Sequence, residues 1–194
     1  SRKRKPKLLG IDISSSTIKV LELGQTSHGY IVESYAVEPI PQNAMDETEI
    51  KDVEQVGQAI ARALKRSRST LTTGAVAVHG SSVITKVIQM NAGLSENEMS
   101  SQISLEADRY IPFPLEEVNL DFQVIGPNEK NPEAVDVLLA ASRSENVDNR
   151  VEVLALAGIA AKVVDVEAYA IERAFCLIAE QLPDQGREKT VAIV

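Results

Sequence analysis

The chain has 194 residues, of which 44% are hydrophobic and 25% are charged, enough for one ordinary core or two small ones. Its 28 acidic residues outnumber its 20 basic residues and give a net charge of -8, which argues against a general nucleic-acid-binding protein. Contacts to nucleic-acid phosphates need surplus positive charge. The single cysteine, Cys176, cannot form an internal disulfide, and its apolar surroundings predict a buried, unreactive thiol. No apolar run reaches the roughly 18 residues that span a bilayer.

The first seven residues differ from the acidic remainder. They contain no acidic side chain and five basic ones, Arg2, Lys3, Arg4, Lys5 and Lys7. Two interpretations remain open for this segment: a solvated end of the chain, or a weak attraction to anionic lipid at a membrane surface.

Three strands in a meander are predicted next. Apolar β-type runs predict strands over residues 8–13, 17–23 and 30–37, with a serine-rich turn after the first and a glycine turn after the second. From residue 50 onward, apolar side chains recur at helical spacing as far as Leu64. The basic residues at the end of this helix complement the negative end of the helix dipole, which explains them without a nucleic acid.

The middle of the chain predicts two further strands and a second helix. Strands are expected over residues 75–78 and 83–90. Ser95 and Glu98 then have the spacing of a capping box, which predicts the start of a helix that Pro112 stops. Strict alternation predicts a strand over residues 118–124, paired with residues 135–141 across a turn-rich surface loop.

The last fifty residues predict two helices around one strand. We expect Ser144 to cap the first helix and Gly158 to end it in a left-handed conformation. A strand over residues 162–166 then leads into a helix over residues 168–181. Because helices alternate with short apolar strands, the sequence indicates an α/β fold with a covered, partly parallel sheet.

Several common active sites have no signature in this sequence. There is no P-loop, no dinucleotide-binding fingerprint and no His-Glu-x-x-His motif. The two histidines, His28 and His79, lie far apart without ligands at metal-binding spacing, which argues against a zinc site. No serine stands in a nucleophile elbow, so nothing supports Ser-His-Asp catalysis.

One segment carries a chemical mechanism. Asp12 ends the first strand, Ser14, Ser15, Ser16 and Thr17 form the turn, and Lys19 lies early in the second strand. Backbone N–H groups, hydroxyls and a cation can bind phosphate groups while a carboxylate holds hydrated magnesium. Taken alone, the segment fits a plain hairpin with a polar turn equally well.

In the context of a three-strand meander followed by α-β-α, this segment resembles the first phosphate loop of the actin and sugar-kinase superfamily. Within that superfamily the chain is similar to the PilM family, FtsA-like cytoplasmic proteins of type IV pilus assembly. The likeness covers essentially the entire chain and is carried by residues 8–23, 75–86, 106–118 and 163–167. The Tyr-Ile-Pro-Phe-Pro stretch at residues 110–114 is specific to this branch.

The resemblance implies an actin-like (ribonuclease-H-like) core formed by residues 1–80 and 144–194. A small FtsA-type α+β subdomain, residues 81–143, is inserted into this core. The resemblance also implies that the second phosphate loop and the adenosine-binding residues follow Val194. We therefore expect that the chain is truncated before its second domain.

For the cofactors, the resemblance implies ATP and Mg²⁺ in the full-length protein. Asp12 takes the magnesium role, Ser14, Ser15, Ser16 and Thr17 contact phosphates, and Lys19 supplies the cation. Because half of the site is missing, we expect weak ATP binding or none in this chain. The family often has glycine at the position of Ser14, and a serine there is strained if the turn requires a positive φ.

For the partner, the resemblance implies the short cytoplasmic N-terminal tail of PilN, an inner-membrane protein, held in a groove between core and insert. Our candidates for this groove are Arg109, Tyr110, Ile111 and Phe113. Residues such as Tyr110 and Ile111, at the end of an amphipathic helix, are more often part of a core than of a groove.

The leading hypothesis is a cytoplasmic scaffold that joins the inner-membrane pilus assembly complex through its partners and is at most a weak ATPase when full length. Self-association is a further expectation. Two alternatives remain open: a small-molecule kinase of the same superfamily, and an FtsA-like filament-forming protein. The kinase would need a catalytic aspartate, which nothing in this sequence marks.

Overall fold

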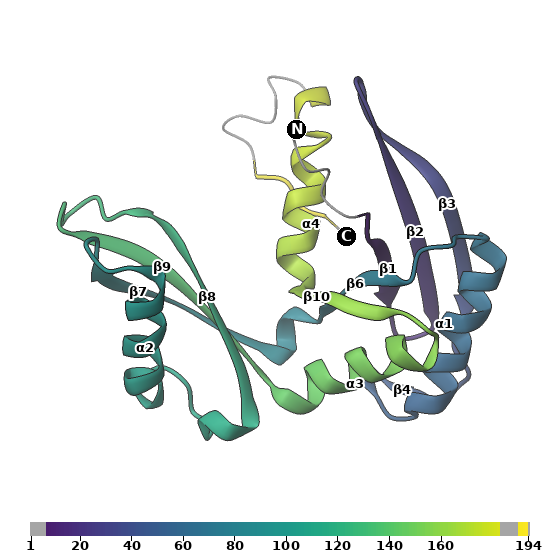
Figure 1. Ribbon diagram of the computed structural model, residues 1–194, viewed down its shortest axis with the longest axis horizontal. Helices are drawn as coiled ribbons and strands as arrows, with labels where there is room; N and C mark the ends of the chain where they lie inside the picture. Colours follow the sequence, from purple (N-terminus) through teal and green to yellow (C-terminus); the bar gives the residue numbers. More distant parts are fainter. Residues whose placement is uncertain (1–6, 183–189, 194) are drawn as a thin grey trace.

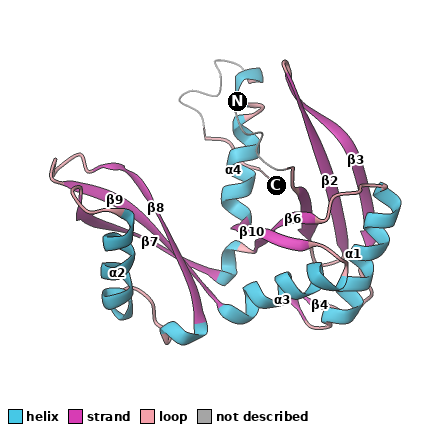
Figure 2. Ribbon diagram, in the orientation of Figure 1, coloured by secondary structure: helices cyan, strands magenta, loops and turns pink. Residues whose placement is uncertain are grey.

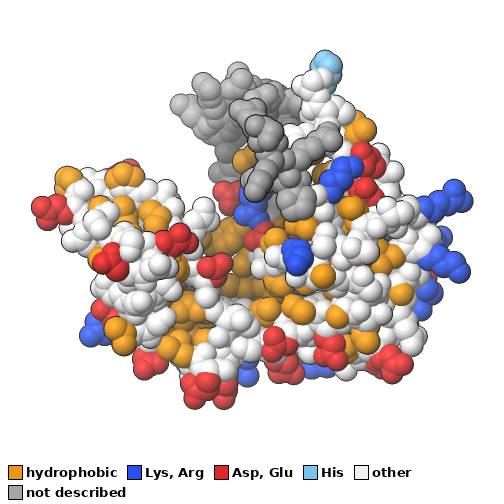
Figure 3. All heavy atoms as spheres, in the orientation of Figure 1, with side chains coloured by type: hydrophobic (Ala, Val, Ile, Leu, Met, Phe, Trp, Pro, Cys, Tyr) orange, Lys and Arg blue, Asp and Glu red, His pale blue; other side chains and the backbone are white. Residues whose placement is uncertain are grey.

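The computed structural model describes residues 7–182 and 190–193, so most of the basic N-terminal segment, Arg2–Lys5, lies outside the described residues. Two lobes are built on separate sheets, a larger core lobe and a smaller insert (Figure 1). In the space-filling view, hydrophobic side chains are visible in the hollow between the two lobes (Figure 3). Within the described ranges, no helix is long and apolar enough to cross a membrane.

The core lobe contains a five-stranded sheet. Its strands are β1 (Leu9–Ile13), β2 (Thr17–Thr26), β3 (Gly29–Pro39), β6 (Thr73–Val78) and β10 (Ala160–Val166), in the order β10-β6-β1-β2-β3. β1, β6 and β10 run parallel, whereas β2 and β3 pair antiparallel. The predicted meander and partly parallel sheet are confirmed. β2 and β3 extend beyond their predicted ends because backbone pairing continues to Thr26 and Gly29 where burial has stopped.

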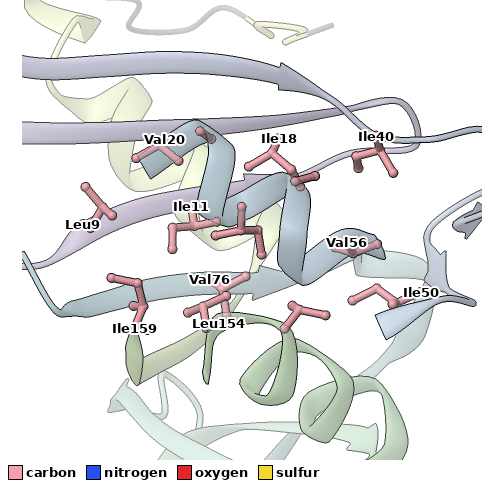
Figure 4. Close-up of a cluster of buried hydrophobic side chains, with 14 of the residues drawn as sticks. Leu9, Ile11, Ile18, Val20, Ile40, Ile50, Val56, Val76, Leu154 and Ile159 are labelled. Carbon is pink, nitrogen blue, oxygen red and sulfur yellow. The ribbon is translucent and has the colours of Figure 1, made fainter. Parts of the chain in front are cut away.

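Two helices cover one face of this sheet, α1 (Val53–Ser67) and α3 (Ser144–Leu156). Their buried side chains interlock with those of β1, β2 and β6 in one apolar layer (Figure 4). Gly57 of α1 lies against α3, because a Cβ added there would stand 2.9 Å from Cβ of Leu156. The first helix therefore needs a residue without a side chain at this contact.

The basic end of α1 has a tertiary role besides complementing the helix dipole. Arg62 Nε and Arg66 Nη1 donate to the Glu38 carboxylate of β3 at 3.0 and 2.9 Å. The Glu38 side chain is only 11% exposed, and these two bonds lower its pKa, with Arg66 the larger cause. The cluster thus ties α1 to the edge strand of the sheet.

The helix after β10 differs from α1 and α3. α4 (Glu167–Cys176) stands away from them and contains no buried residue (Figure 1). The prediction of a buried Cys176 is therefore wrong, because the thiol is exposed. A short 3₁₀ helix, Ala179–Gln181, follows α4.

The insert is a three-stranded antiparallel sheet with one helix (Figure 2). It consists of β7 (Val83–Asn91), α2 (Glu96–Glu106), β8 (Val118–Pro127) and β9 (Ala134–Arg143), with β9 in the centre, and 3₁₀ turns at Ala107–Arg109 and Leu115–Glu117. The capping box is confirmed, because the Ser95 and Glu98 side chains each bond the other residue's backbone N–H. Met99 and Ile103 of α2 pack on Val137 of β9 in a second, separate core.

Two short crossings connect the lobes. The 3₁₀ turn Gly80–Ser82 leads from β6 into β7, and β9 runs directly into α3. Ser144 is consequently the first helical residue, not the cap, and Arg143 at the cap position makes no side-chain capping bond. Ser142 Oγ donates to Ser82 O at 2.9 Å and joins the crossings. Gly158 ends α3 with a φ of 79°, as predicted.

Candidate functional site

The carboxyl ends of the three parallel strands meet at one edge of the core sheet. The Ser14–Thr17 turn follows β1, His79 follows β6 and Glu167 follows β10, with Val78 and Val166 paired in register. In open α/β sheets this edge is where ligands bind, because strand ends and the following loops converge there. We name these groups, together with Asp12 and Lys19, the strand-end site.

The turn of this site is closed by local hydrogen bonds. Ser14 N donates to Thr17 O at 3.0 Å, and Ser14 Oγ lies 3.0 Å from both Thr17 O and Thr17 Oγ1. Ser14 has no positive φ, so the strain expected if glycine were required is absent. Ser15 and Ser16 at the tip are exposed, and their N–H groups make no hydrogen bond to another described residue. Such N–H groups are suited to an anion.

The carboxylate and the cation of the strand-end site are direct neighbours. Asp12 and Lys19 are paired across β1 and β2, and Lys19 Nζ donates to Asp12 Oδ2 at 2.8 Å. Both side chains are about half exposed, at 47% and 46%. The hydrogen bond to Asp12 is the largest cause of the raised pKa of Lys19, which keeps the ammonium charged at neutral pH.

Two residues of this edge were not among our sequence candidates. His79 Nε2 lies 3.6 Å from Glu167 Oε2, and the negative charge of Glu167 also contributes to the raised pKa of Lys19. Each of the two follows a parallel strand directly, which is a signal that sequence contains. This signal alone does not bring His79 and Glu167 together, because that requires knowing that β6 and β10 are neighbouring strands.

The residues of the strand-end site fit phosphate and magnesium. Magnesium keeps most of its waters and takes only one or two carboxylates. Asp12 is such a carboxylate, although an ion would share it with Lys19. No group of three or more metal-ligating side chains exists among the described residues, so a dedicated all-protein metal site is not found in them.

A second candidate site is a cleft of about 590 Å³ between the core and the insert. The core contributes the hairpin of β4 (Met45–Asp46) and β5 (Glu49–Ile50) and the first turn of α3. The insert contributes the start of β7, the segment after α2 and the end of β9. The lining residues are Asp46, Glu47, Thr48, Glu49, Ser81, Ser82, Ile84, Phe113, Ala141, Arg143 and Asn146.

The structure separates the four residues that we predicted for a groove. Phe113 lines the cleft, and the Arg143 guanidinium lies over its ring at 4.5 Å. Ile111 is only 5% exposed and packs with Ala107 in the insert's own core. Tyr110 and Arg109 both direct polar groups to Glu106, at 3.3 Å in each case. Of the four, Phe113 is therefore the residue placed to meet a ligand in this cleft.

One buried cation joins the cleft wall to the sheet. Arg150 of α3 is 3% exposed and donates to Thr48 O at 3.2 Å, to Ala77 O at 2.7 Å and to Asn146 O at 3.1 Å. Burial lowers its pKa, while the charge of Glu167 raises it. The three bonds hold the β4–β5 hairpin, the end of β6 and α3 together.

Comparison with known proteins identifies the family. The family model described as type IV pilus assembly protein PilM matches residues 10–194. The chain belongs to the PilM family. This membership favours pilus assembly over the small-molecule kinase and the FtsA-like filament protein.

Two solved structures are also similar to this chain. A chain of the PilM–PilN type IV pilus biogenesis complex is 29% identical with a TM-score of 0.80, and the match covers 93% of this chain and 53% of that chain. This PilM-family chain thus spans about half of the length of that relative. The expected actin-like α/β fold is confirmed by this match. The cytoplasmic domain of EpsL, an inner-membrane component of the type II secretion system of Vibrio cholerae, is 15% identical with a TM-score of 0.47, and the match covers 82% of this chain and 57% of that domain.

Proposed function

We propose that this chain is the PilN-binding part of a cytoplasmic PilM scaffold, which joins the inner-membrane pilus assembly complex through its partners. The observation that carries the proposal is the cleft between core and insert in a chain that is similar, over 93% of its length, to a chain of the PilM–PilN complex. The occupant is the N-terminal tail of PilN.

The lining of the cleft suits an extended peptide. Peptide clefts combine apolar contacts with a few well-placed polar groups. Phe113, Ile84 and Ala141 supply apolar contacts on the insert side, and Ser81, Ser82 and Thr48 supply polar ones. Because both lobes line the cleft, a bound peptide would contact core and insert together.

Calorimetric titration of the 194-residue chain with a synthetic PilN tail peptide tests this proposal. We expect binding that does not depend on Mg-ATP, and we expect Phe113→Ala to weaken it about tenfold, the loss typical of an aromatic anchor in an interface. Leu105→Ala is the matched control, because Leu105 is an apolar residue of α2 that is 85% exposed and outside the cleft lining. Failure of the peptide to bind this chain or a longer PilM protein would refute the proposal.

We further propose that the strand-end site binds the phosphates of ATP in a longer protein. The N–H and hydroxyl groups of Ser15 and Ser16 would contact phosphate oxygens, Lys19 would neutralise their charge, and Asp12 would hold hydrated Mg²⁺. When bound, the magnesium ion screens the phosphate charge. The described residues contribute a single turn of this kind to the proposed site, so we expect weak ATP binding or none in this chain.

Titration of a fluorescent ATP analogue separates the two cases. We expect micromolar affinity in a longer PilM protein, lost in Lys19→Met, and no saturation in this chain. Micromolar affinity of the 194-residue chain would contradict the expectation that its nucleotide site is incomplete.

A further inference from the structure

The cleft has two chemically different walls. The insert wall is apolar at its centre, where Ile84, Phe113 and Ala141 line it. The core wall is the β4–β5 hairpin, which presents the exposed carboxylates of Asp46, Glu47 and Glu49 within four consecutive residues. A ligand that fills the cleft therefore meets apolar surface on one side and negative charge on the other.

The carboxylates of the hairpin differ in how they are paired. Lys51 Nζ lies 2.8 Å from Glu49 Oε2 and 4.0 Å from Asp46 Oδ2. The hydrogen bond from Lys51 lowers the pKa of Glu49, so this group is ionised at neutral pH. Glu47 forms no ion pair or side-chain hydrogen bond with any described residue and is exposed at the hairpin tip. Its charge is available to a ligand.

The β4–β5 hairpin is held in position by a buried arginine of α3. Thr48, which lies between the acidic residues, accepts a hydrogen bond from the buried Arg150 guanidinium at 3.2 Å. Arg150 is anchored in turn on Ala77 O at the end of β6. A preorganised charge costs little entropy on binding, so a fixed acidic tip selects a ligand better than a mobile one.

A positive charge also lines the cleft. The Arg143 guanidinium stands over the Phe113 ring, and its charge is one of the causes that lower the pKa of Glu49, after the hydrogen bond from Lys51. Glu49 is thus compensated by Lys51 and Arg143, which leaves Glu47 as the hairpin carboxylate that can attract a basic group of a ligand.

We propose that the cleft selects an extended peptide in which a basic side chain is close to an apolar one. The basic side chain pairs with Glu47, beside Glu49 and Asp46, and the apolar side chain packs against Ile84, Ala141 and Phe113. Charge complementarity carries this assignment, and a peptide with an acidic residue at the same place is rejected by the hairpin. The inference rests on the proposed PilN binding and specifies the chemistry that the PilN tail must contain.

The test is a calorimetric double-mutant cycle between protein and peptide. The protein variants are the wild type and Glu47→Gln, and the peptides are the PilN tail and the same tail with every Lys and Arg replaced by Gln. We expect each single change to weaken binding about threefold at low salt, and the second change to add little once the first is made. Added salt should weaken only the wild-type pair appreciably, because it screens exposed charges.

Glu129→Gln is the matched control, because it removes the same charge from the loop between β8 and β9, outside the cleft lining. Its affinity should equal that of the wild type. If the tail binds the wild type but Glu47→Gln behaves like Glu129→Gln, the inference is overturned and the proposed function stands. If the tail does not bind at all, both are overturned.

Discussion

The Asp12–Lys19 hairpin, which is the local part of the strand-end site, and the cleft are assembled in opposite ways. Asp12 and Lys19 are seven residues apart and face each other in one hairpin, so a single local turn brings a carboxylate, a cation and free N–H groups together. The cleft needs the β4–β5 hairpin, two crossings and the end of an inserted sheet. A local site tolerates changes elsewhere in the protein, whereas an assembled site depends on the contacts that position its walls.

The largest expected effect follows from removing the residue that holds the cleft wall. Arg150→Met leaves the carbonyls of Ala77, Asn146 and Thr48 without this donor, and we expect the free energy of unfolding to fall by about 3 kcal/mol. Urea unfolding followed by circular dichroism measures this change. Arg109→Met, at an arginine whose own side chain is 74% exposed, should change stability by less than about 0.5 kcal/mol. Equal losses in the two variants would show that Arg150 is not a tertiary tie.

A smaller effect is expected in the local turn. Ser14→Ala removes the contacts of Ser14 Oγ with Thr17 but keeps the backbone bond, so stability should fall by about 1 kcal/mol or less. Affinity for the PilN tail peptide should stay at the wild-type value because the turn is outside the cleft lining. A weaker peptide affinity in a fully folded Ser14→Ala variant would mean that the two sites are not independent.

The smallest effect concerns the tie between α1 and β3, which touches neither site. The pKa of Glu38 is lowered from 4.5 by Arg66 and Arg62, so the folded state binds its proton less readily than the unfolded chain. Its stabilising contribution is therefore present above about pH 4.5 and lost as the pH falls through the lower folded value. Glu38→Gln should reduce the pH dependence of the unfolding midpoint over this acidic range. If the variant keeps the wild-type pH dependence, Glu38 is not its source.

Predictions from local sequence patterns are confirmed where the interacting residues are close in sequence. The Ser95–Glu98 capping box and the left-handed Gly158 depend on one turn of chain each, and both are confirmed. The prediction for Ser144 was wrong because β9 continues into α3 and leaves no separate cap. Cys176 was predicted as buried from its apolar neighbours, but burial depends on what covers α4, and none of its residues is buried.

The sequence by itself determined the longer strands, the positions of the helices, the phosphate-type turn and the resemblance that indicated the family, because periodicity, caps and hairpin pairing act over a few residues. It did not predict the short strands β4 and β5. Tertiary structure alone decided where Glu167 and His79 meet and which residues line the cleft. Arg150 illustrates the reason: its bonds to Ala77 and Thr48 span 73 and 102 residues. Contacts over such distances are set by the packing of whole elements, and no local pattern encodes them. The same holds for Phe113 and Ile111, two residues apart, of which one lines the cleft and the other is buried.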